Sequence, residues 1–147
     1  MWRRSWLALR MAWWILALPV LKRVMPLPTL VARARSRPGT RTFSREQIGE
    51  IIAVTSRVYQ VLRFGKAGNC LERSLVNYHF LSGSVPNLQL VIGVRRLDQR
   101  IVGHAWVTVD GQVLGENPAS INSYVQVIRF DGSAVPTRPS EPVPNNG

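Results

Sequence analysis

The chain has 147 residues and a formal net charge of +11, which is enough length for one domain with its own hydrophobic core. Its single cysteine excludes an internal disulfide and the usual cysteine-rich zinc sites. The ten lysines and arginines before Glu46 have no acidic residue among them, whereas the remainder is nearly neutral. Such a basic segment attracts nucleic acid, membrane surfaces and acidic proteins through the same electrostatics, so charge alone does not choose among them.

Residues 1–25 are predicted to form a helix rich in leucine, tryptophan and alanine. The uncharged run from Met11 to Leu21 is too short to cross a bilayer, and no A-x-A cleavage site follows it, so we expect a cytoplasmic protein. Four of the five tryptophans lie in this segment. Because tryptophan favours membrane interfaces, we expect peripheral membrane contact, or packing of the helix on the domain behind it, rather than nucleic-acid binding.

Three segments follow from composition. Residues 1–40 form the basic arm, in which Pro26, Pro28 and the basic residues after them indicate a linker. Residues 41–131 carry the apolar periodicity of a folded domain. Residues 132–147 contain four prolines and little apolar content, so we expect disorder there.

The folded segment is predicted to begin with a helix whose start is marked by Ser44 and Gln47, which have the spacing of a capping box. Apolar residues then recur at helical spacing from Ile48 to Leu62, so one stripe of this helix faces the core. The helix is therefore interpreted as scaffold.

A further helix is predicted from Cys70 to Leu81. Asn69 and Glu72 have the spacing of a capping box, which makes Cys70 the first helical residue. Its sulfur then lies beside unpaired backbone N–H groups and the positive end of the helix dipole, which favour the nucleophilic thiolate. The alternative is a non-catalytic core cysteine, because free cysteines are often buried as small apolar residues.

After residue 87 the apolar period changes from helical spacing to two, which predicts strands joined by short turns. A run of helices followed by an antiparallel sheet is typical of an α+β fold. The strands are expected over residues 88–95, 101–109, 112–116 and 124–130.

Two histidines are available to activate the thiol. His79 lies nine residues after Cys70 on the same helix, about 13 Å along its axis and beyond hydrogen-bond reach, so we expect a structural or exposed role for it. His104 lies on the strand 101–109, which folding could bring to the thiol. Cys70 and His104 are therefore the candidate nucleophile and base.

A third residue is needed to orient the imidazole. Asp110 lies about 20 Å from His104 along the strand and is read as a turn residue. If Asp110 and Gly111 form a two-residue loop, Asn117 lies opposite His104. A three-residue loop would place Glu116 there instead. Both an amide and a carboxylate can orient an imidazole, so both residues stay candidates.

The segments CLERSL, LQLVIGVRR and GHAWVTVDGQVLGENP resemble the transglutaminase-like cysteine proteases of lasso-peptide biosynthesis, specifically the protease half of the B protein when it is encoded separately from its leader-recognition half. The resemblance covers about residues 41–130. It implies a transglutaminase-like or papain-like core with an N-terminal helical extension. The family's cysteine, histidine and acid correspond to Cys70, His104 and Glu116; the acid is usually aspartate, and Asn117 stays the alternative.

The resemblance implies a peptidase that cleaves the leader peptide from a ribosomally made precursor. It also implies two partners, a separate leader-recognition protein and an asparagine-synthetase-like, ATP-dependent lasso cyclase. The Cys70 backbone N–H is a candidate oxyanion donor. We expect no cofactor and no metal, because the sequence has no phosphate loop or metal-ligand cluster. Two alternatives are an amide-forming acyltransferase (a true transglutaminase) and a non-catalytic, basic, membrane-associated adaptor.

Overall fold

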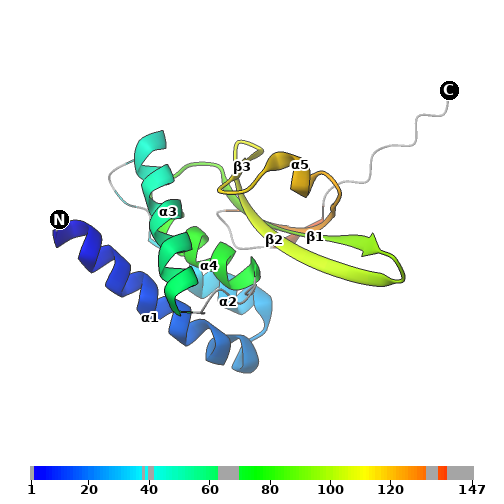
Figure 1. Cartoon of the computed structure of the whole chain (residues 1–147), viewed down its shortest axis with the longest axis horizontal. Coiled ribbons are helices and arrows are strands. Elements are labelled where there is room, and N and C mark those ends of the chain that lie inside the picture. The colour runs from blue at the N-terminus through cyan, green and yellow to red at the C-terminus, as the bar shows by residue number, and fades with distance from the viewer. Residues whose placement is uncertain (1, 38, 40–41, 63–69, 132–135, 139–147) are drawn as a thin grey trace.

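The computed structural model describes residues 2–37, 39, 42–62, 70–131 and 136–138 (Figure 1). Within these residues the helices are α1 (Trp2–Val24), α2 (Leu27–Ala34), α3 (Arg45–Leu62), α4 (Cys70–Leu81) and the short α5 (Pro118–Ile121). The strands are β1 (Leu88–Leu97), β2 (Arg100–Val109), β3 (Gln112–Leu114), β4 (Val125–Phe130) and β5 (Pro136–Thr137). They form one antiparallel sheet in the order β3-β2-β1-β4-β5, which confirms the predicted α+β class.

Helix α4 is the central element of the core. It packs against α1, α2 and α3 on one side and against β1 and β2 on the other (Figure 1). Leu75, Val76 and Leu81 of this helix are fully buried. Because α4 is enclosed by helices and sheet, its first residue, Cys70, has a defined position relative to both layers.

Helix α1 belongs to the same core. Met11, Ile15 and Leu18, spaced on one face of the helix, are fully buried in the cluster that contains Leu75 of α4. The predicted boundary at residue 40 therefore does not correspond to a break in the core. Among the described helices, none is both long and apolar enough to cross a membrane.

The linker expected after residue 25 is wrong in part, because Leu27–Ala34 forms helix α2. Pro26 is its N-cap residue and Pro28 lies in its first turn, where a missing N–H costs no helical hydrogen bond. Leu30 and Val31 are buried against the other helices. The prolines thus start a helix here rather than exclude one.

The predicted capping box of α3 is confirmed. The Ser44 N–H donates to Gln47 Oε1 at 3.0 Å, and the Gln47 N–H donates to Ser44 Oγ at 3.3 Å. Helix α4 begins at Cys70 as predicted, while Asn69, its proposed cap, lies outside the described residues. Most of the tail expected to be disordered, all but residues 136–138, also lies outside them.

Glu72, expected only as a capping residue, is a buried carboxylate that joins three helices. Oε1 accepts a hydrogen bond from Lys22 Nζ of α1 at 2.9 Å, and Oε2 accepts one from the Tyr59 hydroxyl of α3 at 3.1 Å. The residue is 2% exposed. Buried charge is tolerated only when it is paired and hydrogen-bonded, so these contacts hold α4 in place against α1 and α3.

His79 has a structural position on α4, remote from the start of the helix. Its Nδ1 lies 2.8 Å from the Ala34 carbonyl oxygen, and its ring centroid lies 4.1 Å from that of Trp14. Burial lowers the pKa of His79 from the ordinary value of 6.5; the hydrogen bond to Ala34 acts against this shift, and Arg10 acts with it. The folded state therefore binds this proton less readily than the unfolded state.

This difference predicts a pH dependence of stability. The contribution of His79 is present above its unfolded pKa and is lost as the pH falls below about 6.5. We expect His79→Gln, which removes the titrating group, to flatten the dependence of unfolding free energy on pH between about pH 7.5 and pH 5.5. Urea unfolding of the original protein and of His79→Gln at several pH values measures this dependence. An unchanged slope in the variant would contradict this explanation.

Candidate active site

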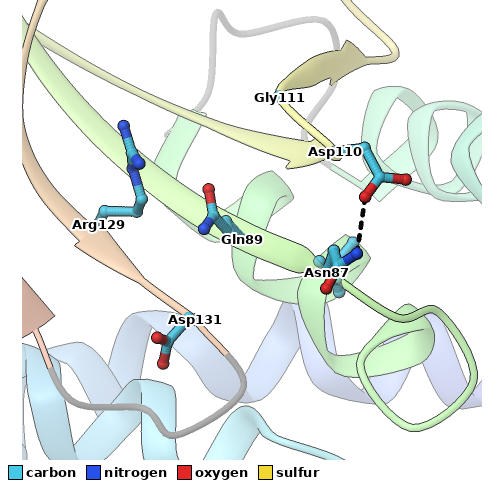
Figure 2. A pocket seen from close by; sticks show the side chains of 7 residues that line it. Asn87, Gln89, Asp110, Gly111, Arg129 and Asp131 are labelled. Carbon is cyan, nitrogen blue, oxygen red and sulfur yellow. Dashed lines mark hydrogen bonds between the residues drawn. The ribbon is translucent and has the colours of Figure 1, made fainter.

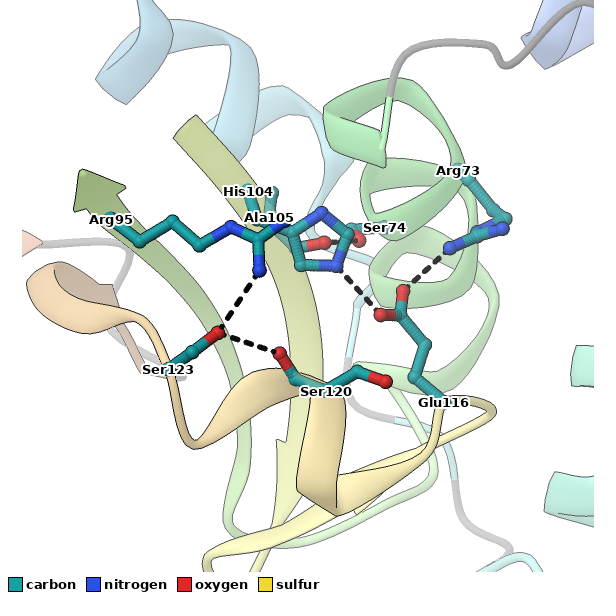
Figure 3. Close-up of polar contacts among 8 residues, drawn as sticks. All are labelled: Arg73, Ser74, Arg95, His104, Ala105, Glu116, Ser120 and Ser123. Atoms are coloured by element: carbon teal, nitrogen blue, oxygen red, sulfur yellow. Dashed lines mark hydrogen bonds and ion pairs between the residues drawn. The ribbon is translucent and has the colours of Figure 1, made fainter. Parts of the chain in front are cut away.

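His104 and Glu116 form a hydrogen-bonded pair. His104 Nε2 lies 2.6 Å from Glu116 Oε2, and the imidazole projects from β2 beside helix α4 (Figure 3). This contact occupies Nε2 and leaves Nδ1 for proton exchange with another group. An imidazole oriented by a carboxylate is the arrangement that a general base requires.

The turn before Glu116 has the shorter of the two expected loops. Val109 pairs with Gln112, so Asp110 and Gly111 form a two-residue loop. Continued ladder pairing beyond this turn would place Asn117 opposite the imidazole. The pairing does not continue, and that extrapolation is wrong.

The ladder ends at Leu114, two residues short of the predicted strand end. Gly115 follows with a left-handed φ of +71°, and a Cβ at this position would lie 2.5 Å from Ile52 Cγ2. Only glycine fits both the backbone conformation and the close approach. The bend at Gly115 takes the chain out of the sheet and brings Glu116 to His104.

Asn117 has a different role in the structure. Its side-chain oxygen accepts a hydrogen bond from the Ala119 N–H at 3.0 Å, which caps α5. Of the two candidates for the third position, the structure brings Glu116 to the imidazole and places Asn117 at a helix start. Whether Glu116 acts in catalysis stays a prediction.

Arg73 completes the binding of the Glu116 carboxylate and was not anticipated from the sequence. Its Nη2 lies 2.5 Å from Glu116 Oε1, so one carboxylate oxygen contacts α4 and the other contacts His104 (Figure 3). The carboxylate therefore joins β2 to α4. The available signal was the position of Arg73 three residues after the cysteine, on the same helix face.

Cys70 is a half-buried free cysteine at the first position of α4. Arg73 and Ser74 follow it by three and four residues, so all three side chains share one helix face. Ser74 Oγ donates to the Ala105 carbonyl at 2.9 Å, beside His104. The face that carries the thiol is thus turned toward β2. No hydrogen bond joins Cys70 to His104 within the described residues; such bonds are often long in unliganded enzymes and tighten with substrate.

The imidazole lies on the sheet face opposite the main helical core. Along β2, His104 and Trp106 point to one face of the sheet, whereas Val107 points to the other face, toward the helices. The His104 ring stacks on Trp106 with centroids 5.9 Å apart. Because β3 pairs only with residues 107–109, β2 is the edge strand at His104, and α4 can lie beside that edge.

A glycine on the neighbouring strand makes room for this stack. Gly93 pairs with His104 in the register of β1 and β2. A Cβ on Gly93 would lie 2.7 Å from Trp106 Cη2 and 2.9 Å from the Val125 carbonyl oxygen. Any larger residue would displace the indole that supports the imidazole.

Pockets at the two ends of β1 are lined by described residues. One, of about 500 Å³, opens beside the imidazole and is lined by Arg95, His104, Glu116, Ala119, Ser120, Ser123 and Tyr124. The other, of about 640 Å³, lies at the opposite end of β1 and includes Asp110, whose Oδ1 accepts from Asn87 Nδ2 at 2.7 Å (Figure 2). Asp110 is therefore a turn residue, away from the imidazole. Among the described residues, no group of three or more His, Cys, Asp or Glu side chains could hold a metal ion.

A helix that begins at a cysteine, packed on an antiparallel sheet that carries an imidazole–carboxylate pair, is the arrangement expected of a transglutaminase-like protein. The chain matches the family model described as the transglutaminase-like superfamily over residues 8–129, and it belongs to that superfamily. The superfamily includes cysteine peptidases and acyltransferases. No curated protein and no solved structure matches the chain significantly.

Proposed function

We propose that the protein is a cysteine peptidase that removes the leader peptide from a ribosomally made lasso-peptide precursor. The main support is the His104–Glu116 pair beside the helix that begins at Cys70, in a superfamily that includes cysteine peptidases. The sequence resemblance described above supports the finer assignment to leader removal.

The proposed mechanism assigns a role to each of Cys70, His104 and Glu116. His104 Nδ1 takes the Cys70 proton, and the thiolate attacks the scissile carbonyl. Glu116 accepts the Nε2 hydrogen bond and stabilises the imidazolium. The imidazolium then protonates the departing amine, which leaves the leader as a thioester on Cys70. Water deprotonated by His104 hydrolyses the thioester and regenerates the thiol. The Cys70 backbone N–H is the candidate oxyanion donor.

The proposal includes two protein partners. A separate leader-recognition protein would present the precursor, and an asparagine-synthetase-like lasso cyclase would use the freed amine for ring closure. The proposed proton transfers and acyl transfer need neither a cofactor nor a metal.

Reconstitution tests the function directly. The full chain is incubated with a lasso-precursor peptide and its leader-recognition protein, and the products are identified by mass spectrometry. We expect a leader with a free carboxylate and a core with a free amine. A new amide on the leader carboxyl would identify an acyltransferase instead. An unchanged precursor, with water or added amine as acceptor, would contradict both activities.

The outer face of α1 favours a second candidate, the membrane-associated adaptor in which Cys70 is structural. Trp6, Leu9, Trp13 and Leu16 follow one another at spacings of three and four and are between 59% and 74% exposed. The helix contains no acidic residue. An apolar stripe with tryptophan on a purely basic helix is typical of segments that lie on anionic membranes. We propose this peripheral contact for α1, and it is compatible with the peptidase too.

Vesicle co-sedimentation tests the membrane contact. We expect binding to phosphatidylglycerol vesicles, weakened by salt and by Trp13→Ser, and little binding to phosphatidylcholine. Val61→Ser is the matched control, because Val61 is 72% exposed but lies on α3. Equal binding of both variants, or equal binding to both lipids, would contradict the proposal.

A further inference from the structure

Arg95 lies beside the imidazole, on the neighbouring strand. Gly93 pairs with His104, and Arg95, two residues further along β1, lies on the same sheet face. Its guanidinium carbon is 4.8 Å from the centre of the Tyr124 ring, and its Nη1 donates to Ser123 Oγ at 3.3 Å (Figure 3). The guanidinium is therefore held in a defined position at the wall of the pocket that contains His104.

Arg95 carries a positive charge that no carboxylate in the lining of this pocket neutralises. Its Nε is buried without a hydrogen-bond partner, and no carboxylate among the described residues forms an ion pair with it. Glu116, the acidic residue in the lining, has its two oxygens engaged by His104 and Arg73. An entering ligand would meet a planar cation with free donors, which is the group that binds carboxylates in a bidentate manner.

The pocket lies on the side of the His104 imidazole toward which the departing amine would leave. Figure 3 places Arg95 on the side of His104 that faces away from α4, the helix that begins at Cys70. In the proposed mechanism the acyl fragment stays on Cys70, and His104 protonates the departing amine. The fragment that carries this amine therefore extends from His104 toward Arg95.

Resting on the proposed function, we propose that this pocket is a subsite for an acidic side chain of the peptide substrate on the amine side of the scissile bond. Arg95 binds its carboxylate, and the hydroxyl of Ser123 and the ring of Tyr124 hold the guanidinium in place. Arg95 is then a specificity-determining residue that acts on substrate binding and not on proton transfer.

The test measures binding separately from cleavage. The full-chain Cys70→Ala protein is titrated with short fluorescein-labelled Gly-Ser peptides that carry either one aspartate or one asparagine, and binding is followed by fluorescence anisotropy. We expect the aspartate peptide to bind about tenfold more tightly, because a charge-assisted contact replaces a neutral one. Adding Arg95→Gln should remove this preference, and Arg95→Lys should retain part of it, since lysine keeps the charge without the planar fork.

Arg96→Gln is the matched control. Arg96 is the next residue of β1, on the opposite sheet face, and its Nε donates to the Asp98 carbonyl at 3.2 Å. This variant loses the same charge outside the pocket and should keep the aspartate preference. Equal affinity for the two peptides, no binding of the aspartate peptide, or the same loss in both arginine variants would overturn the subsite. Thermal unfolding confirms that each variant is folded.

The experiments distinguish failure of the acidic subsite from failure of the proposed peptidase function. The titrated protein has no thiol, so its aspartate preference does not depend on peptide cleavage. An intact preference with an uncleaved precursor would reject leader removal and keep the acidic subsite. A cleaved precursor with no aspartate preference would support leader removal and reject the acidic subsite.

Discussion

Replacement of Cys70 by alanine should abolish precursor cleavage while the protein remains folded. The expected loss in kcat is on the order of 10⁶-fold, because no other group supplies the nucleophile of the acyl-transfer step. The fold should persist, since Cys70 is half-buried at a helix start and forms no disulfide. Single-turnover cleavage followed by mass spectrometry measures the loss, and circular dichroism checks the fold.

His104→Ala serves as the companion variant. Nucleophile and base act as a unit, so the double variant should be no slower than Cys70→Ala alone. A folded Cys70→Ala protein that still processed the precursor at the normal rate would reject the peptidase and leave the adaptor as the better explanation.

The second large effect should come from Glu116. Glu116→Gln is expected to lower kcat by about 10²- to 10⁴-fold with little change in KM, because the amide oxygen can still accept a hydrogen bond from His104 but no longer carries the negative charge that stabilises its imidazolium. Steady-state kinetics on the precursor separates the two parameters. Glu116→Asp should retain part of the activity because it keeps the charge on a shorter side chain.

Asn117→Ala provides the matched control for Glu116. Asn117 is the adjacent residue but caps α5, so its loss should cost about 1 kcal/mol of stability and leave kcat within a few-fold of the original value. The opposite pattern, a small effect at Glu116 and a large one at Asn117, would assign the orienting role to the amide.

The features that were predictable from the sequence are those that depend on residues close together in the chain. The Ser44–Gln47 capping box joins residues that are three apart in the chain, and helix α4 begins at Cys70 as predicted. The change of apolar period after residue 87 likewise identified the antiparallel sheet.

Other features depend on contacts between distant residues and were missed or left open. Helix α2 begins at prolines that indicated a linker, and it is stabilised by burial against other helices. The choice between Glu116 and Asn117 depended on Gly115, whose left-handed bend lies against Ile52 of α3. Turn length alone would have placed Asn117, and not Glu116, opposite the imidazole.

The sequence by itself therefore predicted α3, α4 and the strands β1, β2 and β4 around the site and named Cys70 and His104, since capping, periodicity and the scarcity of reactive side chains are local properties. Only the tertiary structure decided how the imidazole is held: Glu116 contacts it, Arg73 contacts the other carboxylate oxygen, and α4 lies along the open edge of β2. The contacts of α4 with Glu116 and with β2 join residues 43 and 31 positions apart, and His104 and Glu116 are 12 positions apart. Their geometry follows from core packing and from where the ladder ends, which no short stretch of sequence specifies.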